Sequence, residues 1–263
     1  MTLNYKTLGS GKPLVILHGL LGSLDNWITV SKYLSKSYKV YIIDLPNHGK
    51  SYHSQVFSYE DMSNDIDSFF NKNGLTNFSL LGHSMGGKLA LKYTDMFEDK
   101  IDKLIIVDIA NKSYEINRFD HIFKAMFSIS LNNLKSRSDA DNAISNLIKN
   151  EGERNFILKN LKRTADGFKW TPNIMLLHRK LSDISSKINL RRKVKNNTLF
   201  LLGENSNYFN VEDENNLSDE FENYSIKKIQ NSGHWVHAEN PKDFITSVLD
   251  FLGPRVWSFK RFF

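Results

Sequence analysis

The first half of the chain repeats a short apolar run followed by a segment with helical spacing. Strands buried on both faces of a parallel sheet are near-continuously apolar in this way. Parallel neighbours need crossover connections, and right-handed crossovers place helices on both faces of the sheet. We therefore predict an α/β fold with a mostly parallel central sheet flanked by helices. The four runs are Pro13–Leu17, Val40–Leu45, Phe78–Leu81 and Leu104–Val107.

This alternation stops after Asp108 and resumes about 85 residues later. Residues 111–195 contain short stretches with helical spacing and no run typical of a strand. Thr198–Leu202 and Ser225–Ile229 then have strand composition, and Asn240-Pro241 is a helix start with Asn as N-cap. We expect an α/β core made of residues 1–110 and 196–263, with a helical cap inserted at residues 111–195.

Composition narrows the class of protein. The 263 residues are 40% hydrophobic and 24% charged, which is typical of a globular chain. The absence of cysteine excludes a disulfide scaffold, a cysteine nucleophile and cysteine-ligated metal. No apolar run approaches the ~20 residues of a membrane span, and Met1–Lys12 lacks a signal-peptide stretch. We expect a cytoplasmic protein without a stable membrane anchor, and the abundance of Asn and Lys favours a bacterial source.

The most specific local signal is the segment Gly82-His83-Ser84-Met85-Gly86-Gly87. It matches G-x-S-x-G, follows a predicted strand and precedes a predicted helix, which is the context of a nucleophile elbow. The turn forces Ser84 into a strained conformation that neighbouring side chains would obstruct, so glycines flank it. We predict that Ser84 is a catalytic nucleophile.

A serine hydroxyl needs a general base, and the late segment Gly233-His234-Trp235-Val236-His237 offers two histidines. His234 follows the last predicted strand through a glycine turn. Loops after parallel strands gather at one edge of the sheet, so His234 can reach Ser84. We predict His234 as the base and expect His237 to turn away and pack elsewhere.

An acid should orient the imidazole of His234, and two loops could provide it. Asp108 ends the strand Leu104–Val107, and Glu204 follows the strand Thr198–Leu202. The second loop otherwise carries asparagines and a serine, which cannot stabilise an imidazolium as a carboxylate does. We favour Asp108 and keep Glu204 as the alternative.

An oxyanion hole needs two backbone N–H donors. Met85, directly after the nucleophile, offers one, and the glycine-containing loop after Pro13–Leu17 should offer the other. We choose Leu20 in that loop, with Leu21 as the alternative. His18, His48 and His83 accompany these motifs and are expected to form supporting hydrogen bonds, because their spacing fits no metal site.

Together these motifs resemble the α/β-hydrolase superfamily, and more narrowly its YbfF-type esterases. The resemblance spans the whole chain and implies a Ser-His-Asp triad. In that branch the acid is similar in position to Asp108, and an asparagine-serine loop like Asn205-Ser206 replaces the more usual acid. Pro46 departs from the arginine that the branch tends to have. The segments that carry the resemblance are His18–Gly22, Gly22–Trp27, Asp44–Ser51, Gly82–Lys88, Ile101–Lys103, Asp108–Ala110 and His234–Glu239.

The resemblance implies a carboxylesterase that cleaves acyl esters through an acyl-enzyme and needs neither cofactor nor metal. One alternative is a thioesterase acting on acyl-CoA or an acyl carrier protein. Another, of a different class, is a basic binding module on the same fold with an idle triad. A nucleic-acid partner is not expected, because no basic-aromatic recognition motif is present.

Charge is unevenly distributed along the chain. The formal net charge is +6, yet residues 111–195 hold 18 of the 35 Lys and Arg residues and 8 of the 29 Asp and Glu residues. We expect this basic cap to lie over the active-site mouth, where it could steer an anionic acyl carrier. The residues placed there are Lys159, Lys162, Arg163, Arg191, Arg192 and Lys193. The basic, aromatic tail at residues 254–263 has no assigned role.

Overall fold

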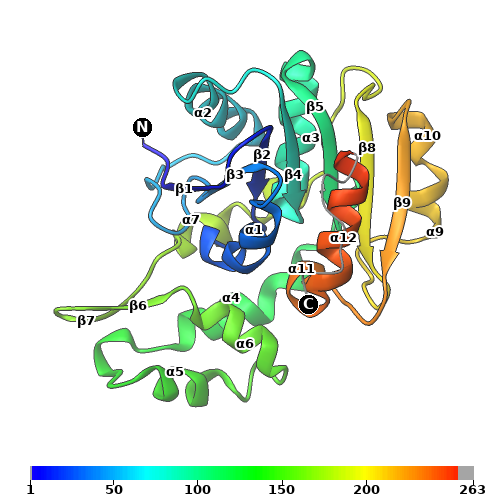
Figure 1. The fold of residues 1–263 in the computed structure, drawn as a ribbon. Coiled ribbons are helices and arrows are strands. Elements are labelled where there is room, and N and C mark those ends of the chain that lie inside the picture. The colour runs from blue at the N-terminus through cyan, green and yellow to red at the C-terminus, as the bar shows by residue number, and fades with distance from the viewer. Residues whose placement is uncertain (1, 254–263) are drawn as a thin grey trace.

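The computed structural model describes residues 2–253, so the tail at residues 254–263 lies outside the described residues. Its centre is a seven-stranded sheet in the order β1-β3-β2-β4-β5-β8-β9, as Figure 1 shows. Only the edge strand β1 is antiparallel to its neighbour. The strands are β1 (Tyr5–Leu8), β2 (Pro13–Leu17), β3 (Lys39–Ile43), β4 (Phe78–His83), β5 (Ile101–Val107), β8 (Asn197–Gly203) and β9 (Tyr224–Ile229). The predicted mostly parallel α/β fold is confirmed.

Helices cover both faces of the sheet because successive strand residues point to opposite sides. Leu14 and Ile16 of β2 pack in one apolar cluster with α1 (Ile28–Leu34) and α12 (Pro241–Leu252). Val15 and Leu17 pack in the other with α2 (Tyr59–Lys72) and α3 (Met85–Phe97). The inner strands β2, β3, β4, β5 and β8 are therefore buried on both faces, which explains their apolar composition, whereas the edge strands β1 and β9 are largely exposed.

Short elements complete the core. A 3₁₀ turn, η1 (Leu24–Asn26), precedes α1, and η2 (Glu98–Lys100) follows α3. The small helices α9 (Val211–Asn215) and α10 (Leu217–Glu220) connect β8 to β9, and α11 (Val236–Glu239) precedes α12. No helix within residues 2–253 has the length and apolarity needed to cross a membrane.

The segment between β5 and β8 forms a layer beside the carboxyl ends of the strands, as the green ribbon in Figure 1 shows. Its 3₁₀ turns are η3 (Ile116–Phe119) and η4 (Leu131–Asn133). Its helices are α4 (Asp120–Ser128), α5 (Arg137–Ile144), α6 (Glu151–Leu158), α7 (Ile174–Arg179) and α8 (Leu181–Ser185).

The expectation that this segment contains no strand is wrong at one place. β6 (Leu161–Thr164) and β7 (Gly167–Trp170) pair antiparallel as a small separate hairpin. Asp166-Gly167 is a hairpin turn signal, and Gly167 adopts a φ of 124°. The strands are short and largely polar, so their alternation is weak, and pairing across the turn decides the structure.

Candidate active site

Ser84 lies at the junction between β4 and α3, where the chain reverses sharply. Its φ of 53° is strained for a residue with a side chain. A Cβ on Gly82 would lie 2.2 Å from the carbonyl oxygen of Gly86, and one on Gly86 would lie 2.4 Å from that of Leu17. Only glycine fits at either position, so the turn can present the Ser84 hydroxyl at the edge of the sheet.

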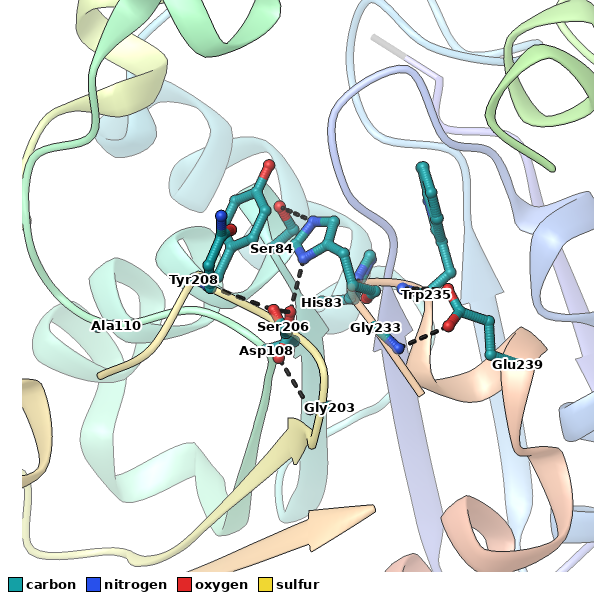
Figure 2. Close-up of polar contacts among 12 residues, drawn as sticks. His83, Ser84, Asp108, Ala110, Gly203, Ser206, Tyr208, Gly233, Trp235 and Glu239 are labelled. Carbon is teal, nitrogen blue, oxygen red and sulfur yellow. Dashed lines mark hydrogen bonds and ion pairs between the residues drawn. The ribbon is translucent and has the colours of Figure 1, made fainter. Parts of the chain in front are cut away.

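His234 lies within hydrogen-bonding distance of both Ser84 and Asp108. Its Nε2 is 3.1 Å from Ser84 Oγ, and its Nδ1 is 2.7 Å from Asp108 Oδ2. Figure 2 shows these contacts converging from separate strand ends. The structure thus brings the three residues predicted for a triad into one chain of contacts, although they lie up to 150 positions apart.

The two candidate acids face different ways. Asp108 is fully buried, and its Oδ1 accepts a hydrogen bond from the backbone N–H of Gly203 at 2.9 Å. Glu204 instead accepts one from the backbone N–H of Asn231 at 3.0 Å. The geometry favours Asp108 as the partner of His234, because Glu204 is engaged in the neighbouring turn.

Ser206 is a site residue to which the sequence analysis gave no role, although it named the Asn205-Ser206 loop. Its hydroxyl donates to Asp108 Oδ2 at 2.5 Å, the same oxygen that contacts His234 (Figure 2). This hydrogen bond fixes the orientation of the Asp108 carboxylate. The place of Ser206 in the sequence could have indicated this role, because the loop after β8 lies at the same edge of the sheet as the loops after β4 and β5.

The two predicted oxyanion donors have free amides. Within residues 2–253 the backbone N–H groups of Leu20 and Met85 have no hydrogen-bond acceptor. The N–H of Leu21, the alternative, donates to Nε2 of His48 at 3.1 Å. Leu21 is therefore already occupied, and Leu20 and Met85 remain available to a substrate oxygen.

His18 and His48 are buried supports for this loop. Nε2 of His18 accepts from the N–H of Leu45 at 3.0 Å, and Nδ1 contacts the carbonyl of Gly19 at 2.8 Å. Nδ1 of His48 likewise contacts the carbonyl of Pro46 at 3.0 Å. An imidazole that accepts on one nitrogen and donates on the other is neutral. Burial lowers the pKa of His18 to about 4 and that of His48 to about 3.

His83 and His237 pack behind the site. Nε2 of His83 donates to the backbone carbonyl of His234 at 2.8 Å and so fixes the segment that carries the base. His237 stacks on Trp27 with ring centres 4.0 Å apart and takes no part in the contacts between His234, Ser84 and Asp108. Burial lowers the pKa of His83 well below its usual range and that of His237 to about 3.

A cavity of about 280 Å³ opens beside Ser84 and His234. The inserted segment forms much of its wall through η3, α4 and α6. Tyr208 stacks on His234 with ring centres 3.7 Å apart, and the Arg118 guanidinium lies 4.2 Å from the Tyr208 ring centre. Arg118 Nη2 donates to Asn207, whereas its buried Nη1 has no partner within residues 2–253. The wall residues from the inserted segment are Arg118, Phe119, His121, Ile122, Glu153 and Phe156.

The predicted basic surface over the mouth is wrong for Arg191 and Arg192. Arg191 Nε pairs with Asp95 at 3.0 Å, and Arg192 pairs with Glu98 at 2.6 Å. Both acids lie near the carboxyl end of α3, whereas Ser84 precedes its first turn. The acidic excess of the core thus neutralises these cations where the inserted segment rejoins the sheet. Nζ of Lys193 donates to a backbone carbonyl in α10, on the same side.

No group of three or more potential metal ligands occurs within residues 2–253. The expected supporting role of His18, His48 and His83 agrees with their hydrogen bonds. What the site offers chemically is therefore a hydroxyl, an imidazole, a carboxylate and two free amides around one point.

Comparison with known proteins identifies the family. A family model described as the alpha/beta hydrolase fold matches residues 12–241. Esterase YbfF of Escherichia coli is 30% identical, over 92% of this chain and 94% of its own length. The sn-1-specific diacylglycerol lipase ABHD11 of Mus musculus is 34% identical, over 96% and 85%. A solved marine microorganism esterase is 38% identical with a TM-score of 0.92, over 95% of this chain and 98% of that one. The chain therefore belongs to the α/β-hydrolase family, among enzymes of the esterase and lipase type.

Proposed function

We propose that this protein is a carboxylesterase that cleaves acyl esters through a Ser84-His234-Asp108 triad and an acyl-enzyme. The observation that carries the proposal is the continuous contact from Ser84 Oγ through the His234 ring to Asp108 Oδ2, at 3.1 and 2.7 Å. A hydroxyl becomes a useful nucleophile when a positioned imidazole can take its proton.

In the first half of the reaction Ser84 Oγ attacks the acyl carbon while His234 Nε2 takes the hydroxyl proton. The carbonyl oxygen becomes an oxyanion that accepts from the amides of Leu20 and Met85. Each such donor contributes roughly 3–4 kcal/mol to lowering the barrier. Asp108 stabilises the imidazolium, which then protonates the leaving oxygen.

In the second half water attacks the acyl-enzyme. His234 takes a proton from the water as its oxygen bonds to the acyl carbon. The tetrahedral intermediate then collapses: the bond between the acyl carbon and Ser84 Oγ breaks, the imidazolium returns the proton to Oγ, and the carboxylic acid leaves. We further propose that residues 111–195 act as a cap, since they supply much of the wall of the cavity beside Ser84.

The test is a Ser84→Ala variant assayed with p-nitrophenyl acetate and with a fluorophosphonate probe. We expect kcat to fall by about 10⁴-fold or more and probe labelling to disappear. The exposed Ser68 on α2 provides the control, because Ser68→Ala should keep both signals. An unlabelled wild-type protein without esterase activity would instead favour the non-catalytic binding module.

One observation favours a second substrate class, a thioester of an anionic carrier such as acyl-CoA. Arg118 Nη1 is buried at the cavity wall with no partner among the residues that the structure describes, while Asn207 and Tyr208 hold the rest of the guanidinium. A positioned guanidinium with a free N–H matches a phosphate or carboxylate oxygen.

This class is tested by comparing acetyl-CoA with p-nitrophenyl acetate at rising salt. For a carrier that Arg118 binds, kcat/KM should fall with salt, whereas kcat/KM for the neutral ester should stay level. Arg118→Gln should remove the salt dependence and lower kcat/KM for the thioester about tenfold. Arg118→Lys should keep part of the salt dependence and part of the wild-type kcat/KM. Equal salt dependence for the two substrates would exclude the anionic-carrier role.

A further inference from the structure

Two cavities of very different size meet at Ser84. The larger, about 280 Å³, is lined by His234 and Trp235 and by side chains of η3, α4 and α6. The smaller, about 20 Å³, lies towards α3 and α8 and is lined by Met85, Ile109 and Ile184, which do not line the larger one. Ser84, Leu20, Phe119 and Tyr208 border both. We call these two cavities the large chamber and the small chamber.

The catalytic geometry decides which half of an ester enters which chamber. In the tetrahedral intermediate the acyl carbon carries Ser84 Oγ, the oxyanion, the leaving oxygen and the acyl substituent. The oxyanion is assigned to the amides of Leu20 and Met85. The leaving oxygen must lie next to His234 Nε2 to receive its proton. Because His234 lines only the large chamber, the leaving group departs there and the acyl substituent is left with the small one.

We propose that the small chamber limits the acyl group to acetyl, while the large chamber accepts a bulky alcohol or thiol. This inference rests on the proposed function of Ser84. In the same measure the small chamber has about 20 Å³ and the large chamber about 280 Å³, so the small one is suited to the smallest acyl substituent, a methyl group. A butyryl chain adds two methylenes beyond that methyl and collides with the chamber wall.

The far wall of the small chamber is held in place by Lys88. Its ammonium donates to the backbone carbonyls of Lys112, Ser185 and Ser186 at 2.8, 2.7 and 2.6 Å. These bonds join α3 of the core to the beginning and end of the inserted segment, so the wall cannot retreat without breaking them.

The same contacts determine whether the small chamber accepts a charged or an uncharged acyl group. An ammonium has three donors, and all three are used here. Lys88 therefore has none left for a carboxylate at the end of an acyl chain. The apolar part of the wall comes from Ile109 and Ile184, together with Leu20, Met85 and Phe119. The chamber is suited to an uncharged acyl group and not to a malonyl or succinyl group.

The experiment varies the acyl chain while the leaving group stays constant, using p-nitrophenyl acetate, butyrate and octanoate. Each excess methylene in a tight apolar pocket changes kcat/KM by about 10–200-fold. We therefore expect kcat/KM to fall at least about a hundredfold from acetate to butyrate, with octanoate lower still. A series of acetates with larger alcohols should show a much smaller decline.

Two isoleucines give matched variants, because Ile184 lines only the small chamber and Ile122 only the large one. Ile184→Ala should raise kcat/KM for the butyrate at least about tenfold relative to the acetate. Ile122→Ala should leave that ratio unchanged and alter only the ranking of the alcohols. Ile184→Val removes only one methylene, so it allows the same test if the alanine variant misfolds. It should shift the ratio of butyrate to acetate in the same direction.

The outcomes separate this inference from the proposed function. Fluorophosphonate labelling of Ser84 together with a preference for octanoate would overturn the acetyl assignment and leave the esterase proposal intact. An unchanged butyrate-to-acetate ratio in both Ile184 variants would also overturn it. Absence of labelling and of all esterase activity would remove the proposed function itself.

Discussion

The loops at the carboxyl edge of the sheet and the inserted segment between β5 and β8 are held by different forces. At the sheet edge, buried groups satisfy one another: Asp108 accepts from three donors, and His18 and His48 each connect two backbone groups. The inserted segment is attached by apolar packing within the larger core cluster, by the Lys88 hydrogen bonds and by surface ion pairs such as Arg191–Asp95. In that pair the arginine side chain is 64% exposed and the aspartate fully buried.

This difference assigns separate tasks to the two regions. The proposed chemistry depends on groups fixed within a few tenths of an ångström, which buried hydrogen bonds on strand ends provide. Selection of the substrate depends on cavity walls, and the inserted segment supplies many of them. We expect substitutions at the sheet edge to change kcat and the stability of the protein at acid pH. Substitutions in the ion pairs that attach the inserted segment should lower the free energy of unfolding only slightly.

The largest expected effect comes from the acid at the sheet edge. Asp108→Asn leaves the shape nearly unchanged but removes the charge that stabilises the imidazolium and its tautomer. We expect kcat for p-nitrophenyl acetate to fall by about 10⁴-fold. Glu204→Gln is the matched control, because Glu204 contacts the N–H of Asn231 instead of His234, and it should change kcat less than about threefold. The reverse ranking would move the catalytic acid to the loop after β8.

A smaller effect is expected in the stability of the sheet edge at acid pH. The folded-state pKa values of His18 and His48, about 4 and about 3, lie below the unfolded value of about 6.5. Between these values the unfolded chain binds protons that the folded chain does not. The contribution of these histidines to the free energy of unfolding should therefore be complete above pH 6.5. It should fall as the pH drops towards 4, by up to about 1.4 kcal/mol per pH unit for each histidine.

Urea unfolding at pH 7.5 and pH 4.5, followed by tryptophan fluorescence, measures this loss. His48→Gln keeps an acceptor for Leu21 and a donor for Pro46 without titrating, so it should make the loss smaller. His53→Gln, which changes an exposed imidazole, should leave the loss as in wild type. A His48→Gln protein with the full wild-type loss would contradict the buried-histidine explanation.

The smallest effect is expected at the attachment of the inserted segment. Arg191→Gln removes an exposed guanidinium from Asp95 and should lower the free energy of unfolding by about 1 kcal/mol, less at high salt. Because Asp95 lies about 15 Å along α3 from Ser84, kcat should not change. Lys124→Gln in the exposed Lys124–Asp120 pair, at 4.0 Å, should have no measurable effect. A large loss of kcat in Arg191→Gln would show that the attachment does position the catalytic groups.

Local patterns were enough to predict the sheet and the elbow. Continuous apolar runs followed by turns identify strands buried on both faces, and the glycines around Ser84 identify a turn that only small residues allow. The hairpin of β6 and β7 escaped prediction because its strands are four residues each and mostly polar. Its stability comes from pairing across one turn, which a scan for apolar periodicity does not detect.

The candidate site could be predicted where function requires a residue type in a defined local context. Ser84 and His234 belong to glycine turns after strands, so the topology alone places them at one edge. Asp108 and Glu204 both satisfied that rule, and the direction of each side chain separated them. Ser206 was missed because a serine in a polar loop has no distinctive local pattern.

By itself the sequence determined the order of the strands predicted for the core, the strained turn that carries Ser84, and the chemical types available at the sheet edge. Those properties follow from backbone sterics and apolar periodicity, which act between near neighbours. Only the tertiary structure decided that Arg191 and Arg192 neutralise core acids, that Ser206 supports Asp108, and that two unequal chambers meet at Ser84. These properties depend on distances between residues far apart in the chain, which are set only when the inserted segment packs on the core.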